Sequence, residues 1–372
     1  MYTLTMNCGG DVMPNIPLSI DECMEKVHFS GYFLWQQFAE KLLNGETPDE
    51  NWWKPLFAHP GYAALTGPNF PSELISSNME LAFMPSRQDE LKDIQADPPP
   101  SYNFILGHFV HIRDNMKNFR GAVEDFRQNL ETVIEKAFSQ ALEFLPNLDL
   151  DKFDYPEIHF LVFAADGLSS SAIIFDLLTA VETGPEASIG YLAHEIHHYY
   201  RHLILRLNIP EIGEKDMHFL RILDRIHSEG LANRLDKHIN IPETARDYHF
   251  RRREWFASMV DESPEVIRKI NALFDDGENH GGRLDGIAAK IQKLLPMSGN
   301  PLGCFMHGHI EKHFTHDEIR TNADNPFSFF GFYNRSAEGG LLSPRFSDTF
   351  MEVIDNLQTR YLISEQFQEA VS

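Results

Sequence analysis

The sequence predicts an α+β protein that is predominantly helical and carries one small sheet near its middle. Two patterns support this fold class. Apolar residues recur at helical spacing over most of the chain, whereas residues 157–164 and 172–175 are short runs rich in β-branched and aromatic residues, which are typical of strands. Of the 372 residues, 42% are hydrophobic and 23% are charged, so the apolar surface is sufficient to order most of the chain.

Residues 1–100 are expected to form a helical N-terminal region that packs on the rest of the protein. Apolar spacing predicts short amphipathic helices within residues 17–45 and 72–84. Residues 97–101 include three consecutive prolines, which stop helices, so we expect a linker there. The aromatic, turn-rich segment 52–62 is expected to close the core of this region, and the alternative is that it caps an active-site cleft.

Residues 101–372 are expected to form the catalytic domain. Residues 104–144 are predicted to form one or two long helices, and the two short strands follow, separated by a turn at Asp166-Gly167. From Thr183 onward the chain is again mostly helical. The segment from Thr183 to Glu186 has the form of a capping box with a proline inside it, which predicts that a helix begins here.

The charge balance argues against some classes of partner. The chain has 32 basic and 55 acidic residues and a formal net charge of −23. We therefore expect no nucleic-acid partner, because nucleic-acid-binding surfaces need a basic stripe, and the one basic run, residues 251–253, is expected to lie on a solvated helix face. No run of 18 apolar residues is present, so no membrane span is expected. Three scattered cysteines and an N-terminus without a signal-peptide pattern predict a cytoplasmic protein.

The most informative motif is H-E-x-x-H, the pattern of zinc metalloproteases, which reads His194-Glu195-Ile196-His197-His198. Histidines at positions i and i+4 lie on one face of a helix, so His194 and His198 can reach one metal ion. Glu195 then lies near a metal-bound water and can take its proton. His197 points about 100° away from the ligand face, so we expect it to be a core or supporting residue.

A third ligand is predicted on a later helix, over residues 217–238. The candidate is Glu229, in the segment Glu229-Gly230-Leu231-Ala232. Small residues beside Glu229 would let two helices approach closely, which a carboxylate needs in order to reach a metal held by the other helix. Gly230 costs about 1 kcal/mol in a helix relative to alanine, so a compensating role is expected for it.

These two motifs together resemble the gluzincin branch of zinc metallopeptidases. More narrowly, residues 155–335 resemble a family of uncharacterised bacterial proteins described as zinc-dependent peptidases. That family has His-Glu-x-His-His, then Glu-Gly-x-Ala, then a Gly-rich helix that ends in Ile-Glu. The third motif corresponds here to residues 303–311, although Cys304 stands where the family often has an aromatic residue. The spacing between the first two motifs implies an inserted loop around residues 208–215.

The resemblance implies a zincin-like catalytic core and a set of residue roles. His194, His198 and Glu229 would bind Zn²⁺ and leave an open position for water, and Glu195 would be the general base. The substrate would be a peptide or a protein. The strand at 172–175 would be the edge strand beside the active-site helix and would hold an extended peptide. Either Asn233 or Asp236 would orient a ligand histidine.

Gluzincins also use a downstream histidine or tyrosine to stabilise the oxyanion. The resemblance offers three candidates, His307, His309 and Tyr333, of which His307 is slightly preferred. His309 and His313 stand at positions i and i+4 and could also hold a second metal. The sequence leaves open the substrate, the choice between internal and terminal cleavage, and the oligomeric state.

Two alternatives from other classes remain open. A carboxylate-bridged di-iron helical protein, which would bind iron or act as an oxidoreductase, uses two Glu-x-x-His pairs. The chain offers such pairs in Glu25-Lys26-Val27-His28 and in Glu195 with His198, but this hypothesis leaves His194 without a role. The second alternative is a non-catalytic metal-binding protein. Closed structural zinc sites usually have four ligands and are rich in cysteine, which argues against it.

Overall fold

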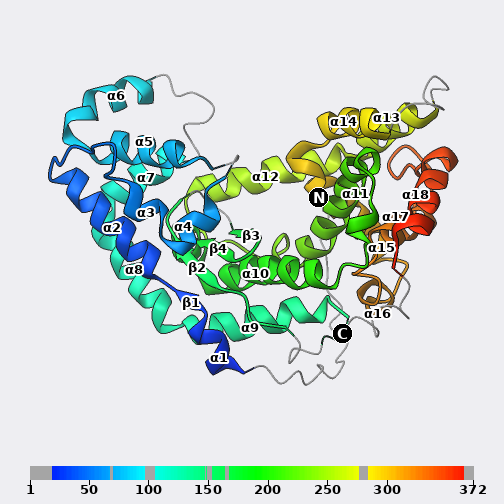
Figure 1. Cartoon of the computed structure of the whole chain (residues 1–372), viewed down its shortest axis with the longest axis horizontal. Coiled ribbons are helices and arrows are strands. Elements are labelled where there is room, and N and C mark those ends of the chain that lie inside the picture. The colour runs from blue at the N-terminus through cyan, green and yellow to red at the C-terminus, as the bar shows by residue number, and fades with distance from the viewer. Residues whose placement is uncertain are drawn as a thin grey trace.

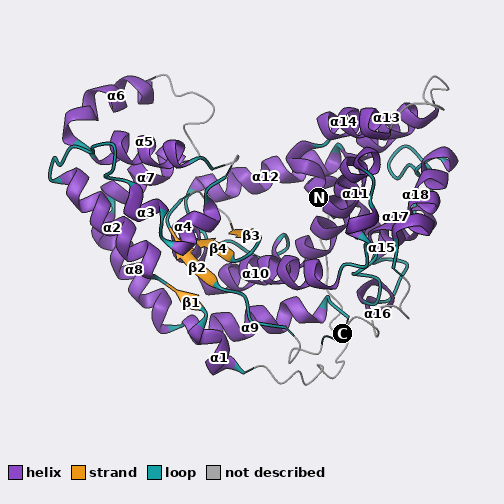
Figure 2. Cartoon of the chain, viewed as in Figure 1, coloured by secondary structure: helices purple, strands orange, loops and turns teal. Residues whose placement is uncertain are grey.

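The computed structural model describes residues 19–67, 70–96, 105–146, 148, 153–163, 167–275 and 284–363. These residues form a mostly helical protein with a small four-stranded sheet, as the sequence predicts (Figure 2). The strands are β1 (Val27–His28), β2 (Ile158–Leu161), β3 (Gly167–Ser169) and β4 (Ile173–Asp176). The helices before β2 are α1 (Ile20–Glu25), α2 (Ser30–Leu43), α3 (Lys54–Phe57), α4 (Pro60–Leu65), α5 (Ser72–Phe83), α6 (Gln88–Ala96), α7 (Ile105–Asp114), α8 (Met116–Gln128) and α9 (Leu130–Glu143).

The helices after the sheet build the remainder of the molecule. They are α10 (Leu177–Ile204), α11 (Glu214–Asp236), α12 (Asp247–Asp261), α13 (Ser263–Asp275), α14 (Leu284–Leu294), α15 (Asn300–Ile310), α16 (His316–Arg320), α17 (Pro326–Ser336) and α18 (Asp348–Tyr361). In Figure 1, helices α2 to α8, coloured blue to cyan, lie on the left of the sheet. Helices α11 and α13 to α18 lie on the right, at the far end of α10. No helix of the described residues combines the length and the apolar character that crossing a membrane requires.

The sheet has the strand order β1-β2-β4-β3, in which β1, β2 and β4 are parallel and β3 is antiparallel to β4. Both predicted strands are present, but the expectation that residues 172–175 form the edge strand is wrong. Residues 167–169 pair with β4 and occupy the edge instead. Gly167, predicted to lie in a turn, is the first residue of this edge strand, and Asp166 lies outside the described residues.

The N-terminal region is helical, but the strand inside it was not predicted. Residues 27–28 interrupt the helix expected within 17–45 because they pair with β2, and residues 17 and 18 lie outside the described part. The aromatic segment closes the core of this region, as expected: Trp52 packs edge-on against Phe38 at 4.5 Å between ring centroids, and Tyr62 donates a hydrogen bond to the carbonyl of Val162 at 2.9 Å. The predicted linker at 97–101 lies outside the described residues.

The long helical stretch before β2 divides into three helices rather than one or two. The breaks fall at Asn115 and Asn129, whose backbones leave helical geometry. Each of these side chains donates to a backbone carbonyl four residues earlier. Asparagine disfavours helix interiors because its amide competes for such backbone partners, and the apolar spacing that guided the prediction continues through both breaks.

The start of α10 corrects the predicted capping box. The helix begins at Leu177, where the carboxylate of Asp176 accepts a hydrogen bond from the backbone of Thr179 at 2.9 Å. Thr183 does not cap a helix, because its hydroxyl donates back to the carbonyl of Thr179. The helix is instead kinked at Gly184, whose φ of 80° is a left-handed conformation suited to glycine, and Pro185 follows it.

Helix α11 covers the predicted segment, and its glycine has a role other than the one expected. A side chain at Gly230 would lie 2.8 Å from the carbonyl oxygen of Gly303, and one at Gly303 would lie 2.2 Å from the carbonyl oxygen of Ile226. The two glycines therefore let α11 and α15 cross in backbone contact. On the opposite side, α10 approaches the end of α11 through Gly190, which touches the carbonyl of Leu235.

Candidate metal centre

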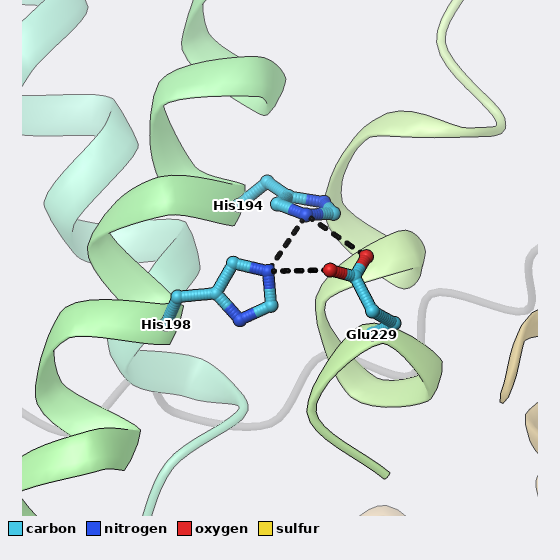
Figure 3. Close-up of side chains that lie close together, drawn as sticks. All are labelled: His194, His198 and Glu229. Atoms are coloured by element: carbon cyan, nitrogen blue, oxygen red, sulfur yellow. Dashed lines mark hydrogen bonds and ion pairs between the residues drawn. The ribbon is translucent and has the colours of Figure 1, made fainter. Parts of the chain in front are cut away.

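Helices α10 and α11 pack against each other and run in opposite directions, because His194 contacts Asp236, His198 contacts Ser228 and Arg201 contacts Asp224. The H-E-x-x-H turn of α10 therefore faces the C-terminal half of α11. Ile189, Leu192 and Ile196 bury the other face of α10 in the core. His194 and His198, one turn apart, both point toward α11, and Glu229 reaches back from α11 toward them (Figure 3). The metal-binding atoms of these three side chains all lie within 4.8 Å of one another.

The donor set and its spacing fit a zinc ion. The Nε2 atoms of His194 and His198 are 2.9 Å apart, and they lie 3.6 and 3.5 Å from the two carboxylate oxygens of Glu229. A tetrahedral zinc ion with bonds of about 2.0–2.1 Å separates its ligand atoms by about 3.3 Å. Two imidazoles and a carboxylate form a common catalytic zinc ligand set that leaves a fourth position open.

The second nitrogen of each histidine has its own partner. Nδ1 of His194 lies 3.2 Å from a carboxylate oxygen of Asp236, and Nδ1 of His198 lies 2.7 Å from the hydroxyl of Ser228. These contacts orient both rings so that Nε2 faces the common centre. Of the two residues expected to orient a ligand histidine, Asp236 does so. Asn233 instead donates to the side chain of Asn300 at 3.0 Å.

Asn300 orients the third ligand. Its amide donates to Oε2 of Glu229, and Arg225 donates to the other carboxylate oxygen at 2.8 Å. Asn300 begins α15 directly after a turn in which Met297 and Ser298 have φ of 45° and 56°. Such left-handed backbone is costly for residues other than glycine and tends to occur at functional sites. The turn therefore places Asn300 against the carboxylate.

The electrostatics of the site favour a cation between the three side chains. Burial alone would lower the pKa of His194, but the carboxylates of Asp236 and Glu229 outweigh it and raise that pKa to about 10. Burial lowers the pKa of His198 to about 4. Burial would also raise the pKa of the Glu229 carboxyl, yet the neighbouring imidazoles and Arg225 hold it well below its usual range. The ionised carboxylates thus stabilise positive charge at this position.

Glu195 lies against the edge strand. A Cβ atom at Gly167 would lie 2.6 Å from Cγ of Glu195 and 3.0 Å from one of its carboxylate oxygens. Only glycine fits at this position without displacing the Glu195 side chain. The first residue of β3 and the predicted general base therefore pack directly on each other at the edge of the sheet.

All four motif residues open onto one cavity of about 1480 Å³. Its wall includes the edge strand, the outer turns of α10 and α11, two residues of α12 and the turn before α15. The lining residues from these segments include Leu168, His194, Glu195, His198, Arg221, Arg225, Glu229, Tyr248, Arg252, Met297 and Asn300. A cavity of this size accommodates several residues of an extended peptide.

The structure does not bring His307 into this cavity. His307 is buried on α15 next to Phe329 and is not among the residues that line the cavity, and burial lowers its pKa to about 3. Tyr333 donates to the carbonyl of Pro344, and His309 packs on the Tyr333 ring. None of the three oxyanion candidates lines the cavity. His307 and His309 belong to α15, which packs on α11 at Gly303, and Tyr333 belongs to α17.

The other histidine motifs do not form a second metal site within the described residues. Among them, His194, His198 and Glu229 are the one group whose donor atoms converge. His313 contacts the carbonyl of His309. His197 is fully buried in the core, as expected.

The Glu-x-x-His pair of the di-iron hypothesis does not form a helical ligand pair, because the two residues lie in different elements. Glu25 ends α1, whereas His28 belongs to strand β1 and bonds to Glu157. Neither Glu25 nor His28 lines the cavity.

Sequence reasoning missed several residues of the site. Asn300, Gly167 and Tyr248 carry no motif, and Arg252 belongs to the basic run that was expected to face solvent. A Gly-Asn-Pro sequence at 299–301 signals a helix start, but nothing local shows that its asparagine reaches Glu229, 71 positions away. Tyr248 and Arg252 carry hydrogen-bond donors and line the cavity. His307, the preferred oxyanion candidate from the sequence, does not line it.

Fold and site together define a mostly helical protein in which a candidate His/His/Glu metal-binding group opens onto a large cavity. The chain belongs to the family described as "Putative zinc dependent peptidase (DUF5700)", whose model matches residues 53–339 and so includes His194, His198 and Glu229. The narrower resemblance, to the family of uncharacterised zinc-dependent peptidases, is confirmed. The family is described as zinc dependent, and zinc is accordingly the cofactor assigned to the His/His/Glu group. Neither a curated protein nor a solved structure matches the chain.

Proposed function

We propose that this protein is a zinc-dependent peptidase of the gluzincin type, with a zincin-like core formed by the sheet, α10 and α11. One observation carries the proposal: the ligand atoms of His194, His198 and Glu229 converge in a cavity that Glu195 also lines. A bound zinc would supply Lewis acidity, which lowers the pKa of water and polarises a carbonyl. His194, His198 and Glu229 would hold it.

Glu195 is the general base in this proposal. It follows His194 on the same turn of α10, and its carboxylate rests on Gly167 at the cavity wall. From this position the carboxylate takes a proton from the attacking water and then delivers it to the leaving amine. The contact with Gly167 restricts the side chain, so the proton acceptor is already oriented before a substrate enters.

We place the substrate along the outer edge of β3, which pairs with no other strand among the described residues. Its other edge pairs with β4, and Leu168 on β3 lines the cavity. An extended peptide that adds to this edge receives backbone hydrogen bonds independent of its sequence. Because Gly167 touches Glu195, a peptide bound here passes directly beside the general base.

The non-catalytic alternative is less well supported by the same geometry. A closed structural zinc site has four protein ligands, whereas three converge here within the described residues, next to a large cavity. Glu195 is not one of the residues whose donor atoms converge, so a purely structural zinc site does not require it. Loss of peptidase activity when Glu195 is replaced, with zinc still bound, would favour the peptidase over the non-catalytic protein.

The test is Glu195→Gln beside Glu186→Gln, an exposed glutamate on the same helix. Both proteins would be loaded with zinc, their metal content measured by mass spectrometry, and their cleavage of a peptide library followed by the same method. We expect both to hold one zinc per chain, and we expect Glu195→Gln to lose activity by about 10²–10⁴-fold while Glu186→Gln keeps it. Equal turnover by Glu195→Gln and wild type would refute the base role.

A further inference from the structure

The cavity has two chemically different ends. Beyond the metal ligands in one direction its wall carries charged groups, including Arg221 and Arg225 on successive turns of α11. In the other direction the wall comes mostly from the N-terminal helices and the sheet and is mainly apolar, with Asn78 and the serines at 169–171 as polar members. Its apolar residues include Leu74, Leu81, Ile105, Leu106, Phe163 and Phe175.

The apolar end is built on adjacent faces of three elements. Leu74, Asn78 and Leu81 stand at i, i+4 and i+7 on α5, so one stripe of this helix faces the cavity, and Asn78 is its polar member. Ile105 and Leu106 come from the first turn of α7. All of these apolar groups except Leu74 are buried, yet they line the cavity, whereas Leu74 stands at its rim with 39% of its surface exposed.

This end adjoins the general base. Phe175 on β4 pairs directly with Gly167 on β3, so their side-chain positions lie on the same face of the sheet. The position of the missing side chain at Gly167 points at Glu195. The Phe175 ring therefore lies on the sheet face that carries the general base, one strand away from it, and the apolar wall begins beside the reacting groups.

We propose that this apolar end is a specificity pocket that binds a large hydrophobic side chain, of leucine or phenylalanine size, on one side of the scissile bond. The inference rests on the proposed peptidase function and names its substrate class. Burying a leucine side chain rather than an alanine favours binding, whereas a charged side chain would lose its hydration without gaining a partner. A discrimination of about 10- to 100-fold in kcat/KM between leucine and alanine peptides is expected.

Two measurements test the pocket. Cleavage sites in a peptide library would be mapped for the zinc-loaded enzyme, and leucine and alanine versions of the best peptide would be compared in kcat/KM. The same two peptides would then be titrated against Glu195→Gln by fluorescence anisotropy, which requires no turnover. Large apolar residues at one fixed position, and tighter binding of the leucine peptide to Glu195→Gln, are the expected results.

The variant Leu74→Asp adds a carboxylate at the pocket rim, where a solvated group is tolerated. It should reduce the preference for leucine and raise relative cleavage of a lysine peptide by about fivefold. Leu43→Asp is the matched control, because Leu43 is similarly exposed at 37% but does not line the cavity, and it should change neither ratio.

The outcomes separate this inference from the proposed function. Equal affinity of Glu195→Gln for both peptides overturns the pocket whether or not the wild type cleaves them, and so does an unchanged preference in Leu74→Asp. If the wild type cleaves leucine and alanine peptides equally well, the pocket is overturned while the peptidase function stands. If no peptide is cleaved by zinc-loaded wild type, the peptidase function fails. Titration of Glu195→Gln with an extended peptide that carries leucine or alanine at its central position then decides whether the pocket selects a hydrophobic side chain, and equal affinities overturn it.

Discussion

Two clusters of histidines in this protein have similar composition but different chemistry. The metal centre joins His194 and His198 to Glu229. The second cluster, in which His28, His59 and His159 lie near Glu157, sits where β1 and β2 pair beside α4; we call it the N-terminal histidine cluster. Both combine imidazoles with a carboxylate, but within the described residues the donor atoms converge in the metal centre alone.

The difference lies in where the ring nitrogens point. In the N-terminal histidine cluster the rings of His28 and His159 stack at 4.9 Å between centroids, so they present faces rather than nitrogens to each other. His28 is bound to Glu157, and His59 bonds to the hydroxyl of Ser30 at 2.8 Å. Adjacent parallel strands place His28 and His159 side by side, which favours ring stacking.

The metal centre differs because its two histidines share one helix face and its carboxylate arrives from an opposing helix. The second nitrogen of each ring is already engaged, by Asp236 and by Ser228, so the first is directed to the centre. A metal site therefore depends on converging lone pairs and on the outer contacts that orient them, and a local concentration of histidine is insufficient.

The largest contrast is expected in metal content. His198→Ala should lose stoichiometric zinc, because two remaining protein ligands hold the ion weakly, whereas His159→Ala should keep one zinc per chain. Mass spectrometry of folded protein, purified by size exclusion, measures both. Zinc retained by His198→Ala together with zinc lost from His159→Ala would reverse the assignment of the two clusters.

The convergence of the three candidate ligands should also depend on how closely α11, which carries Glu229, crosses α15. Gly303→Ala places a Cβ atom against the carbonyl of Ile226, so we expect about 1–3 kcal/mol of destabilisation and weaker zinc binding. Gly308→Ala on the same helix is the control. Nothing lies within 4 Å of its added carbon, and alanine favours a helix over glycine, so this variant should be neutral or more stable by up to about 1 kcal/mol. Denaturant unfolding compares them, and equal stabilities would refute the crossing argument.

Asn300 tests the outer contacts of the metal centre. Removing its amide in Asn300→Ala leaves the three ligands in place but frees one oxygen of Glu229, so zinc affinity should fall by about 10- to 100-fold. Asn334→Ala also removes a hydrogen-bonding amide, one that bonds the backbone of Phe346 away from the cavity, and should not change zinc affinity. Competition with a chromogenic chelator measures both constants. Identical affinities would mean that the strained turn before α15 has no part in holding the ligand.

A pH dependence is expected of the N-terminal histidine cluster. Burial lowers the pKa of His159 from 6.5 to about 4, and the nearby His28 and His59 act in the same direction against Glu157. As the pH falls, the unfolded chain therefore takes up a proton on His159 at a higher pH than the folded chain does. The contribution of neutral His159 is complete above pH 6.5 and declines as the pH falls toward 4, by at most about 1.4 kcal/mol per pH unit.

His159→Phe should remove this slope. Because the metal ligands also titrate, both the reference and the variant would carry His198→Ala. Urea unfolding between pH 7.5 and 4.5 gives the two profiles, and parallel profiles would show that His159 is not the group that titrates.

Local patterns predicted a substantial part of the fold and the site. The spacing of His194 and His198, the third ligand on α11, and strands β2 and β4 follow from periodicity and residue type, which operate over a few residues. The same reasoning failed where a neighbour in space overrides the local signal. Pairing with β2 converts residues 27–28 from helix to strand, and Asp176 starts α10 well before the apparent capping box.

Local sequence is sufficient to identify His194 and His198 as candidate ligands, because one helix turn fixes the relation between them regardless of the rest of the chain. What surrounds them depends on the tertiary structure. Asn300 reaches Glu229, Gly167 packs on Glu195, and His307 lies outside the cavity, each through contact between elements far apart in the chain. Such contacts arise from packing of whole elements, to which side chains distant in the sequence contribute jointly, and no short stretch of residues specifies them.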